Sequence, residues 1–269
     1  VDIIGTPDEE VMGGKIVMAD KGIFKKYDLA IMIHMYNKNI ISPQMLALDG
    51  LLFNFIGKAA HASAAPWEGR NALNAVQLFF HALDMMRQHV RPDVRIHGYI
   101  RDGGKSPNVV PDFTSAEIYT RSKERTYLDE ISQWVKDCAK AAALATKTNV
   151  EVGELCPSLK DLSFNATGSK ILEEIFNDLD LSLTDSIDES FGSSDIGHVD
   201  YQCPTFHPMI SINKPYVTHT EEFAKAMKDE STYEAIRKGG EVISRFIMES
   251  FNNESIIDNI RKDYNKVHI

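Results

Sequence analysis

The chain has 269 residues, of which 43% are hydrophobic and 25% charged, a composition typical of a folded globular protein rather than a disordered or fibrous one. The 29 basic and 39 acidic residues give a net charge of −10, which argues against nucleic acid as a partner. The sequence contains no apolar run of about 20 residues, so we expect no membrane-spanning segment. Its three cysteines, Cys138, Cys156 and Cys203, are too far apart for a disulfide framework or a zinc ribbon, and a cytoplasmic location is expected.

Residues 1–45 are predicted to form the first part of an α/β domain. Residues 1–5 resemble the end of a strand that runs into a turn at Pro7. Because the chain starts inside this strand and without a methionine, we expect it to be a fragment of a longer protein. A short helix is predicted over residues 11–22, and the apolar run 28–35 predicts a buried strand that ends at His34.

Residues 46–158 are predicted to form a complete small domain. Alternating apolar residues predict strands, and apolar residues at helical spacing predict helices. The elements follow in the order strand 48–58, helix 71–89, strand 94–101, strand 112–121, helix 124–147 and strand 149–155. This β-α-β-β-α-β order is that of a ferredoxin-like sandwich. Its two edge strands, and the many large apolar residues of the first helix, predict a homodimer formed through this domain.

Residues 159–269 carry fewer strand signals. A helix is predicted over residues 163–178 and a broken strand over 204–213. A long helix over 221–251, interrupted at Gly239 and Gly240, precedes a polar tail that we expect to be frayed. Neither this segment nor residues 1–45 has enough strands for a stable sheet of its own. We therefore expect the two to form one α/β domain, with residues 46–158 inserted between them.

Two adjacent glutamates, Glu9 and Glu10, follow the first predicted strand. In one interpretation Asp8 caps the next helix and both glutamates interact with its N-terminal dipole. In the other, one carboxylate binds a metal ion while its neighbour reaches a water on that ion. His34 is either a core histidine or a ligand at a strand end, and His219 is either a surface histidine or a ligand. One glutamate and two histidines are a plausible donor set for zinc.

Three loops carry unusual residue patterns. In residues 57–63 small residues surround His61, which indicates either a tight turn or close approach of a ligand or another chain. Residues 102–111 are rich in glycine and proline around Asn108 but lack the spacing of a phosphate-binding loop. The backbone amides around Ser194 and Asp195, in residues 192–197, could bind a carboxylate, or this loop is only a connection.

These motifs occur in the order found in one known family. They are Pro-Asp-Glu-Glu at 7–10, Gly-Gly-Lys at 13–15, His34 after Met-Ile, the His61 loop, Pro-Asn-Val-Val-Pro at 107–111, Ser194-Asp195 and His219-Thr220. The chain resembles, over essentially its whole length, the dinuclear-zinc metallopeptidases and amidohydrolases. These include aminoacylase, glutamate carboxypeptidase and the aminobenzoyl-glutamate hydrolase-like enzymes.

The resemblance implies an α/β catalytic domain with an inserted lid. It also implies hydrolysis of an amide bond in a small N-acyl amino acid or dipeptide-like substrate. Zinc is the implied metal, with manganese or cobalt as alternatives. The implied roles are Glu9 as general base, Glu10, His34 and His219 as metal ligands, and Asn108, Arg121, Ser194 and Asp195 as substrate-binding residues. His61 would face the substrate, serving the active site of a partner subunit.

One departure from the family concerns the metal-binding loop that precedes the Glu-Glu turn. The family uses a histidine and a bridging cysteine or aspartate there, and this chain contains neither. If the chain is a fragment, these ligands lie upstream. The alternative is a truncated, non-catalytic relative whose lid serves as an oligomerisation module. In the chain as given, we expect Glu10, His34 and His219 to converge and to hold one zinc ion with an open coordination position.

Overall fold

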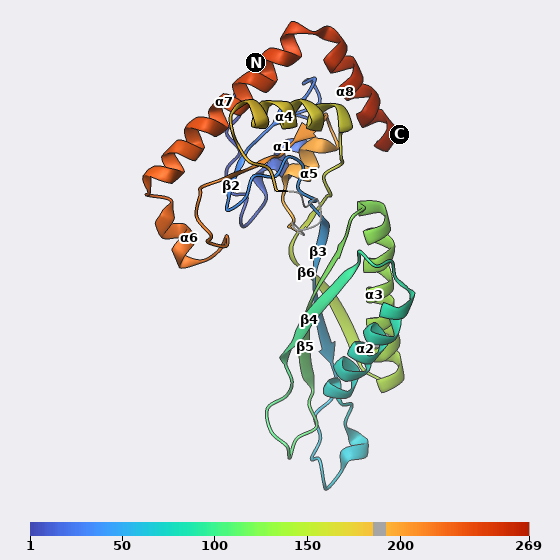
Figure 1. The fold of residues 1–269 in the computed structure, drawn as a ribbon. Helices are drawn as coiled ribbons and strands as arrows, with labels where there is room; N and C mark the ends of the chain where they lie inside the picture. Colours follow the sequence, from blue (N-terminus) through green and yellow to red (C-terminus); the bar gives the residue numbers. More distant parts are fainter. Residues whose placement is uncertain (185–191, 269) are drawn as a thin grey trace. The chain divides into compact units, whose positions relative to one another are not determined.

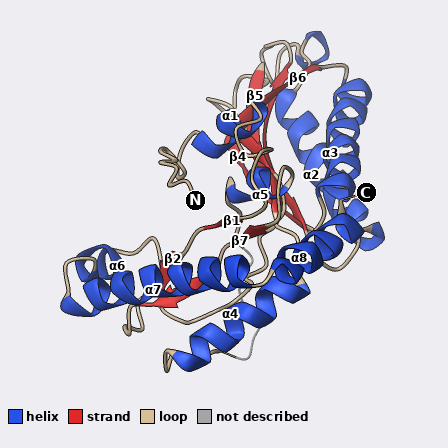
Figure 2. Cartoon of the chain, turned by 90° about the horizontal axis from the view of Figure 1, so that it is seen from above, coloured by secondary structure: helices blue, strands red, loops and turns tan. Residues whose placement is uncertain are grey.

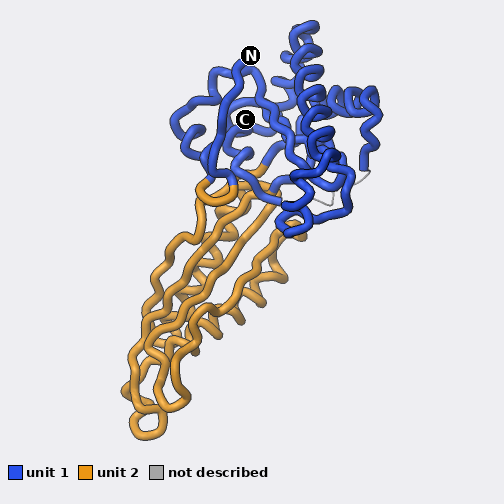
Figure 3. Tube along the Cα trace, turned by 90° about the vertical axis from the view of Figure 1, so that its left-hand side faces the viewer, with its two compact units in different colours: residues 1–9, 13–45, 162–269 blue, residues 10–12, 46–161 orange. Residues whose placement is uncertain are grey.

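The structure is a computed structural model that describes residues 1–184 and 192–268. The chain divides into two compact units, shown in Figure 3. Unit 1 comprises residues 1–9, 13–45 and 162–269, and unit 2 comprises residues 10–12 and 46–161. The predicted inserted domain spans residues 46–158, whereas unit 2 contains residues 46–161 together with residues 10–12.

Unit 2 is a four-stranded antiparallel sheet with helices α2 (Ala72–Met86) and α3 (Arg125–Thr146) on one face (Figure 1). The strands are β3 (Ala47–Ile56), β4 (Arg95–Asp102), β5 (Phe113–Ser122) and β6 (Asn149–Leu159), in the spatial order β4-β5-β3-β6. Short 3₁₀ turns span Pro66–Glu68 and Arg87–His89. This arrangement confirms the ferredoxin-like lid that the sequence predicts.

The core of unit 2 lies between the sheet and the two helices. Phe53 and Phe55 on β3 are fully buried, and their rings lie 4.7 and 5.8 Å from the ring of Phe79 on α2. The helix begins where the Asn71 side chain accepts hydrogen bonds from two backbone amides of the first turn. Side chains on β5 alternate between the two faces of the sheet. Tyr119 lies on the face away from the helices, as the alternation of a strand predicts.

A buried ion pair fixes the start of α3 to the sheet. The Arg125 guanidinium donates to both carboxylate oxygens of Asp49 on β3, at 2.9 and 2.7 Å, and both side chains are about nine-tenths buried. Ser132 also donates to Asp49, and the Arg125 backbone amide donates to Asp161 at 2.8 Å. Burial alone would raise the pKa of Asp49, but the hydrogen bonds from Arg125 and Ser132 outweigh it, so this pKa lies below its ordinary value.

Unit 1 combines two-stranded parallel pairs with helices. Strand β1 (Ala30–Ile31) pairs with β7 (Thr205–Phe206), and β2 (His34–Tyr36) pairs with β8 (Met209–Ser211). The helices are α1 (Gly14–Asp20), α4 (Ala166–Asp178), α5 (Ile196–Asp200), α6 (Glu221–Ala226), α7 (Glu230–Asn252) and α8 (Glu254–Val267). Helices α4, α7 and α8 contact one another (Figure 2), and they enclose Phe176, Phe246 and Ile260. No helix within residues 1–184 and 192–268 is long and apolar enough to cross a bilayer.

The predicted continuous strand over residues 28–35 is wrong. The segment forms two short strands, and His34 begins β2 instead of ending the first strand. The cause lies in the partner segment, where Pro208 separates β7 from β8. Proline has no backbone N–H, so the ladder is interrupted there, and only the carbonyl of Pro208 takes part, accepting from the His34 amide at 3.1 Å.

The frayed tail predicted after residue 251 is also wrong, because residues 254–267 form helix α8. The Asn253 side chain caps this helix by accepting from the Ser255 amide at 3.1 Å, and Ile260 is fully buried against α4 and α7. The Ile260 carbonyl also accepts from the Asn165 side chain at 2.9 Å. The break in the long helix falls between α6 and α7, at residues 227–229, and α7 continues through Gly239.

Replacing Arg125 with alanine is expected to lower the free energy of unfolding by about 3–5 kcal/mol, because it leaves the buried Asp49 carboxylate without its cation. Urea denaturation monitored by circular dichroism measures this change. The control is Lys140→Ala on the same helix, whose ion pair with Asp137 is exposed; its cost should be at most about 1 kcal/mol.

The same pair gives a pH dependence. The pKa of Asp49 is lowered on folding, so the Asp49 carboxylate stabilises the folded state. Its contribution to the free energy of unfolding is complete above the ordinary aspartate pKa of about 3.9. It is lost as the pH falls through the lower pKa of the folded state. The stability difference between the wild type and Arg125→Ala should therefore shrink in strong acid. A difference that is small at neutral pH would contradict this account of the pair.

Candidate functional site

The turn that carries Glu9 and Glu10 precedes α1 and is held by backbone contacts. Asp8 has a left-handed φ of 66°, and its carbonyl accepts from the Gly13 amide at 2.9 Å. Glu9 is half-buried and Glu10 is exposed. Gly13 occupies the N-cap position of α1, and no side chain caps the helix, so the interpretation in which Asp8 caps it is wrong. Both glutamates lie before the first helical turn.

Two glycines make this turn sterically feasible. A Cβ atom on Gly14 would lie 2.0 Å from the carbonyl oxygen of Pro7. Gly13 has a left-handed φ of 66°, and a Cβ there would lie 2.6 Å from Ile16. The Gly-Gly pair therefore lets α1 start directly against the turn that carries the glutamates.

Asp195 fixes the start of α1 to the segment before α5. Its carboxylate accepts from the Lys15 ammonium at 2.8 Å and from the Lys15 backbone amide at 3.0 Å. The exposed fractions of the Lys15 and Asp195 side chains are 3% and 0%. Ser194, its neighbour, is also buried and its hydroxyl accepts from the Ile196 amide. Both oxygens of Asp195 are thus occupied within the protein, so its carboxylate fixes the backbone around the Glu9 turn.

His34 is exposed at the start of β2, and its ring lies against that of His207, with centroids 5.8 Å apart and planes at 73°. His207 is 2% exposed. Burial lowers its pKa to about 3, so its imidazole is neutral. Its Nδ1 atom is buried and has no hydrogen-bond partner among the residues that the structure describes. No motif in the sequence singles out His207, and its place between a short apolar strand and Pro208 is a weak local signal.

His219 lies immediately before α6, in a left-handed conformation with φ 63°. Thr220 caps that helix by accepting from the Phe223 amide. His219 is exposed, which fits both a ligand at the mouth of a site and a surface histidine.

The three predicted metal ligands do not share one unit. His34 and His219 belong to unit 1, whereas Glu10 groups with unit 2. Within the described residues, no three His, Cys, Asp or Glu side chains form a group that could hold a metal ion. The donor chemistry of the set fits zinc, but this arrangement does not gather it, and the metal site stays a prediction.

His61 and Asn108 lie in two loops of unit 2 that pair with each other beyond the ends of β3 and β5. The Ala62 amide donates to the Asn108 carbonyl at 2.9 Å, and His61 forms a bridge with Val109. A Cβ atom on Gly57 would lie 2.1 Å from the Arg70 carbonyl oxygen, so glycine is required where β3 enters these loops. Both His61 and Asn108 are exposed, and the structure brings these two predicted residues together.

Arg121 lies at the opposite end of the sheet. The register pairs Ile56 with Phe113 at the loop end of β5, and Leu48 with Arg121 near the other end. The eight steps from residue 113 to residue 121, at about 3.3 Å per residue, separate the ends by roughly 26 Å. Arg121 is half-buried, and burial lowers the pKa of its guanidinium. It is therefore not grouped with His61 in this chain.

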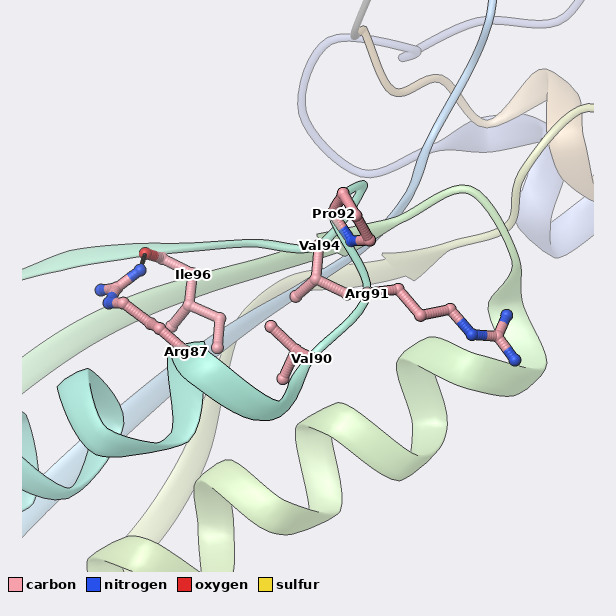
Figure 4. A pocket seen from close by; sticks show the side chains of 6 residues that line it. All are labelled: Arg87, Val90, Arg91, Pro92, Val94 and Ile96. Atoms are coloured by element: carbon pink, nitrogen blue, oxygen red, sulfur yellow. Dashed lines mark hydrogen bonds between the residues drawn. The ribbon is translucent and has the colours of Figure 1, made fainter.

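A hollow of about 200 Å³ lies beside the turn that follows α2 (Figure 4). The residues that line it are Arg87, Val90, Arg91, Pro92, Val94 and Ile96. Arg87 donates to the Ile96 carbonyl, and Arg91 pairs with Glu124 at 2.9 Å while stacking over Tyr127. Since both guanidinium groups already have partners and none of the predicted site residues lines it, this hollow is not the candidate site.

The chain is similar to known peptidases and hydrolases. Residues 48–147 match the M20 peptidase dimerisation domain. The chain is 28% identical over 98% of its length to a mouse Xaa-Arg dipeptidase, and 35% identical over 56% of its length to one of the p-aminobenzoyl-glutamate hydrolase subunits of Escherichia coli. It spans 62% of the length of the dipeptidase and 32% of the length of the hydrolase subunit.

A solved structure from methicillin-resistant Staphylococcus aureus, titled a putative aminohydrolase, superposes with a TM-score of 0.73. The match covers 91% of this chain and 65% of that one at 16% identity, which shows a shared fold. These findings confirm the resemblance to the peptidases and amidohydrolases that the motifs indicate, and they confirm the α/β fold with its lid.

The Asp195→Ala variant is expected to lose about 3–5 kcal/mol of unfolding free energy, because the buried Lys15 ammonium would lack its counter-charge. Urea denaturation measures the loss, with Lys225→Ala as the control, since its pair with Glu221 is exposed. The double variant Lys15→Met, Asp195→Ala should recover part of the loss, because no charge is then left buried. A single variant as stable as the control would show that the pair does not stabilise the turn.

Proposed function

We propose that the protein containing this chain hydrolyses the amide bond of a small N-acyl amino acid or dipeptide-like substrate, with zinc, manganese or cobalt as its metal. The order of the motifs and the names of the relatives support this proposal. The observation that carries most weight is the Glu9–Glu10 turn, which places two adjacent glutamates, one half-buried and one exposed, before α1.

In the proposed mechanism, Glu10, His34 and His219 would hold the metal, which supplies a water of lowered pKa and polarises the substrate carbonyl. Glu9 accepts a proton from the attacking water. It then returns this proton to the amine that leaves, so that the carboxylate is restored at the end of the cycle. The division of roles between the adjacent glutamates is the one that the resemblance to the metallopeptidases implies. The backbone around Ser194 and Asp195, fixed by Lys15, supports the turn beside the substrate.

His61 and Asn108 would stabilise the negative oxygen that develops on the substrate carbonyl. Side-chain N–H groups at such a position are typically worth a factor of about 10² to 10³ in turnover. Arg121 would bind a substrate carboxylate, since a guanidinium forms bidentate pairs with carboxylates. Because Arg121 lies roughly 26 Å along β5 from Phe113, where the strand meets the loops that carry His61, we do not expect both to contact one small substrate from the same chain. This separation favours a homodimer in which His61 serves the active site of the partner subunit.

The Glu9→Gln variant of the full-length protein is expected to lose about 10²- to 10⁴-fold in kcat, because glutamine cannot accept the proton. Its metal content, measured on the purified protein, should be unchanged. The matched variant Glu10→Gln should lose metal as well as activity.

Near-normal turnover by Glu9→Gln with metal bound would remove Glu9 from the base role. If the wild type binds no metal and hydrolyses none of a panel of N-acyl amino acids and dipeptides, the alternative of a non-catalytic oligomerisation module is supported instead.

Complementation tests the proposed dimer. Glu9→Gln and His61→Ala should each be nearly inactive alone. If His61 acts across the dimer, a mixed dimer contains one site with both residues intact. Equal mixing should then restore about a quarter of the wild-type activity, because half of the dimers are mixed and each has one complete site.

Sedimentation velocity, run on the same samples, reports the oligomeric state. No recovery of activity after demonstrated subunit exchange would mean that His61 acts within its own chain. A wild type that sediments as a monomer would contradict the homodimer itself.

A further inference from the structure

We propose that the turn formed by residues 61–64 locks the His61 imidazole in the tautomer that carries its proton on Nε2. Ser63 and Ala64 are then positioning residues, and His61 presents a hydrogen-bond donor. This inference deepens the proposed function and rests on it for the catalytic consequence, but the tautomer itself is a property of the turn.

Three groups of the turn converge on Nδ1 of His61. The Ser63 and Ala64 backbone amides donate to it at 3.4 and 3.2 Å, and the Ser63 hydroxyl lies 3.3 Å away. A backbone N–H can only donate, so Nδ1 must offer a lone pair. A neutral imidazole carries one N–H, and its proton is therefore on Nε2.

The backbone around His61 is fixed on both sides. The Ala65 amide donates to the His61 carbonyl at 3.1 Å and closes the turn. The Ala62 amide donates to the Asn108 carbonyl at 2.9 Å, and the Val110 amide donates to the Ala60 carbonyl at 2.9 Å. The turn is thus tied to the second loop before and after His61, and the ring is anchored from its own chain.

This geometry separates two roles that a histidine can take. With the proton on Nε2, the exposed ring edge donates a hydrogen bond to a developing oxyanion, and no bond to hydrogen has to break. The other tautomer would present a lone pair there, which repels a negative oxygen and suits a general base. The turn therefore assigns His61 to oxyanion stabilisation and leaves the proton transfers to Glu9.

Nitrogen-15 NMR of the histidine rings tests the tautomer directly in the full chain, at alkaline pH where imidazoles are neutral. His61→Gln identifies the His61 signals, and the exposed His89 serves as an internal reference. We expect a protonated Nε2 and a bare Nδ1 for His61. A dominant Nδ1–H form, or a mixture like that of His89, would overturn the inference whether or not the protein is an enzyme.

Variants then link the turn to catalysis. Ala64→Pro removes one amide donor, since proline has no N–H, and should lower kcat by about tenfold with KM little changed. Ser63→Ala removes the hydroxyl but keeps both amides, and should be much milder. Circular dichroism confirms folding of each variant.

These experiments distinguish the locked tautomer of His61 from its proposed role in oxyanion stabilisation. If His61 shows the expected tautomer but His61→Ala retains full activity, the oxyanion role fails while the locked turn stands. If Ala64→Pro keeps both the tautomer and the kcat of the wild type, Ala64 is not a positioning residue.

Discussion

The pairing of β3 with β6 is the constraint on which the rest of the structure depends. The chain enters unit 2 through β3 and leaves it through β6, and these strands are antiparallel neighbours. Entry and exit therefore lie at the same end of the sheet, where the Leu162 amide donates to the Met45 carbonyl. The Asp49–Arg125 pair fixes the start of α3 at that end. The flanking segments can then pair with each other, as β1 with β7 and β2 with β8.

The lid was predictable from the sequence because each of its elements is long and periodic. Strand β3 and helix α2 carry enough apolar residues at regular spacing for local pattern to determine their type. Strands of two or three residues in unit 1 carry no such period, and their limits depend on Pro208 in a partner segment distant in sequence. Helix α8 was missed because its polar composition hides the few apolar residues, Ile256 and Ile260 among them, that hold it to the core.

In the candidate site, too, local sequence indicates the residue types, whereas the contacts that support them depend on the folded chain. The roles of Glu9, His34 and His61 stay predictions, and they rest on residue type and motif order because hydrolytic chemistry restricts which side chains can serve. The supporting contacts were not predictable, since Lys15 and Asp195 are 180 positions apart and either residue alone suggests a surface charge. His207 is a similar case: its neutrality follows from burial, which only the folded packing of β2 against β8 produces.

The His61 ring is oriented by its own turn, so its orientation does not depend on contacts with the catalytic domain. Among the residues that the structure describes, the hydrogen bonds to the His61 ring come from Ser63 and Ala64, and the backbone is held by the neighbouring loop of the same unit. In the proposed dimer, the lid would therefore present a donor that its own turn already orients. By contrast, the Glu9 turn is fixed by a buried pair that unit 1 must fold to create. The groups proposed for proton transfer and for oxyanion binding are thus organised independently, as the proposed sharing of a site between two subunits would require.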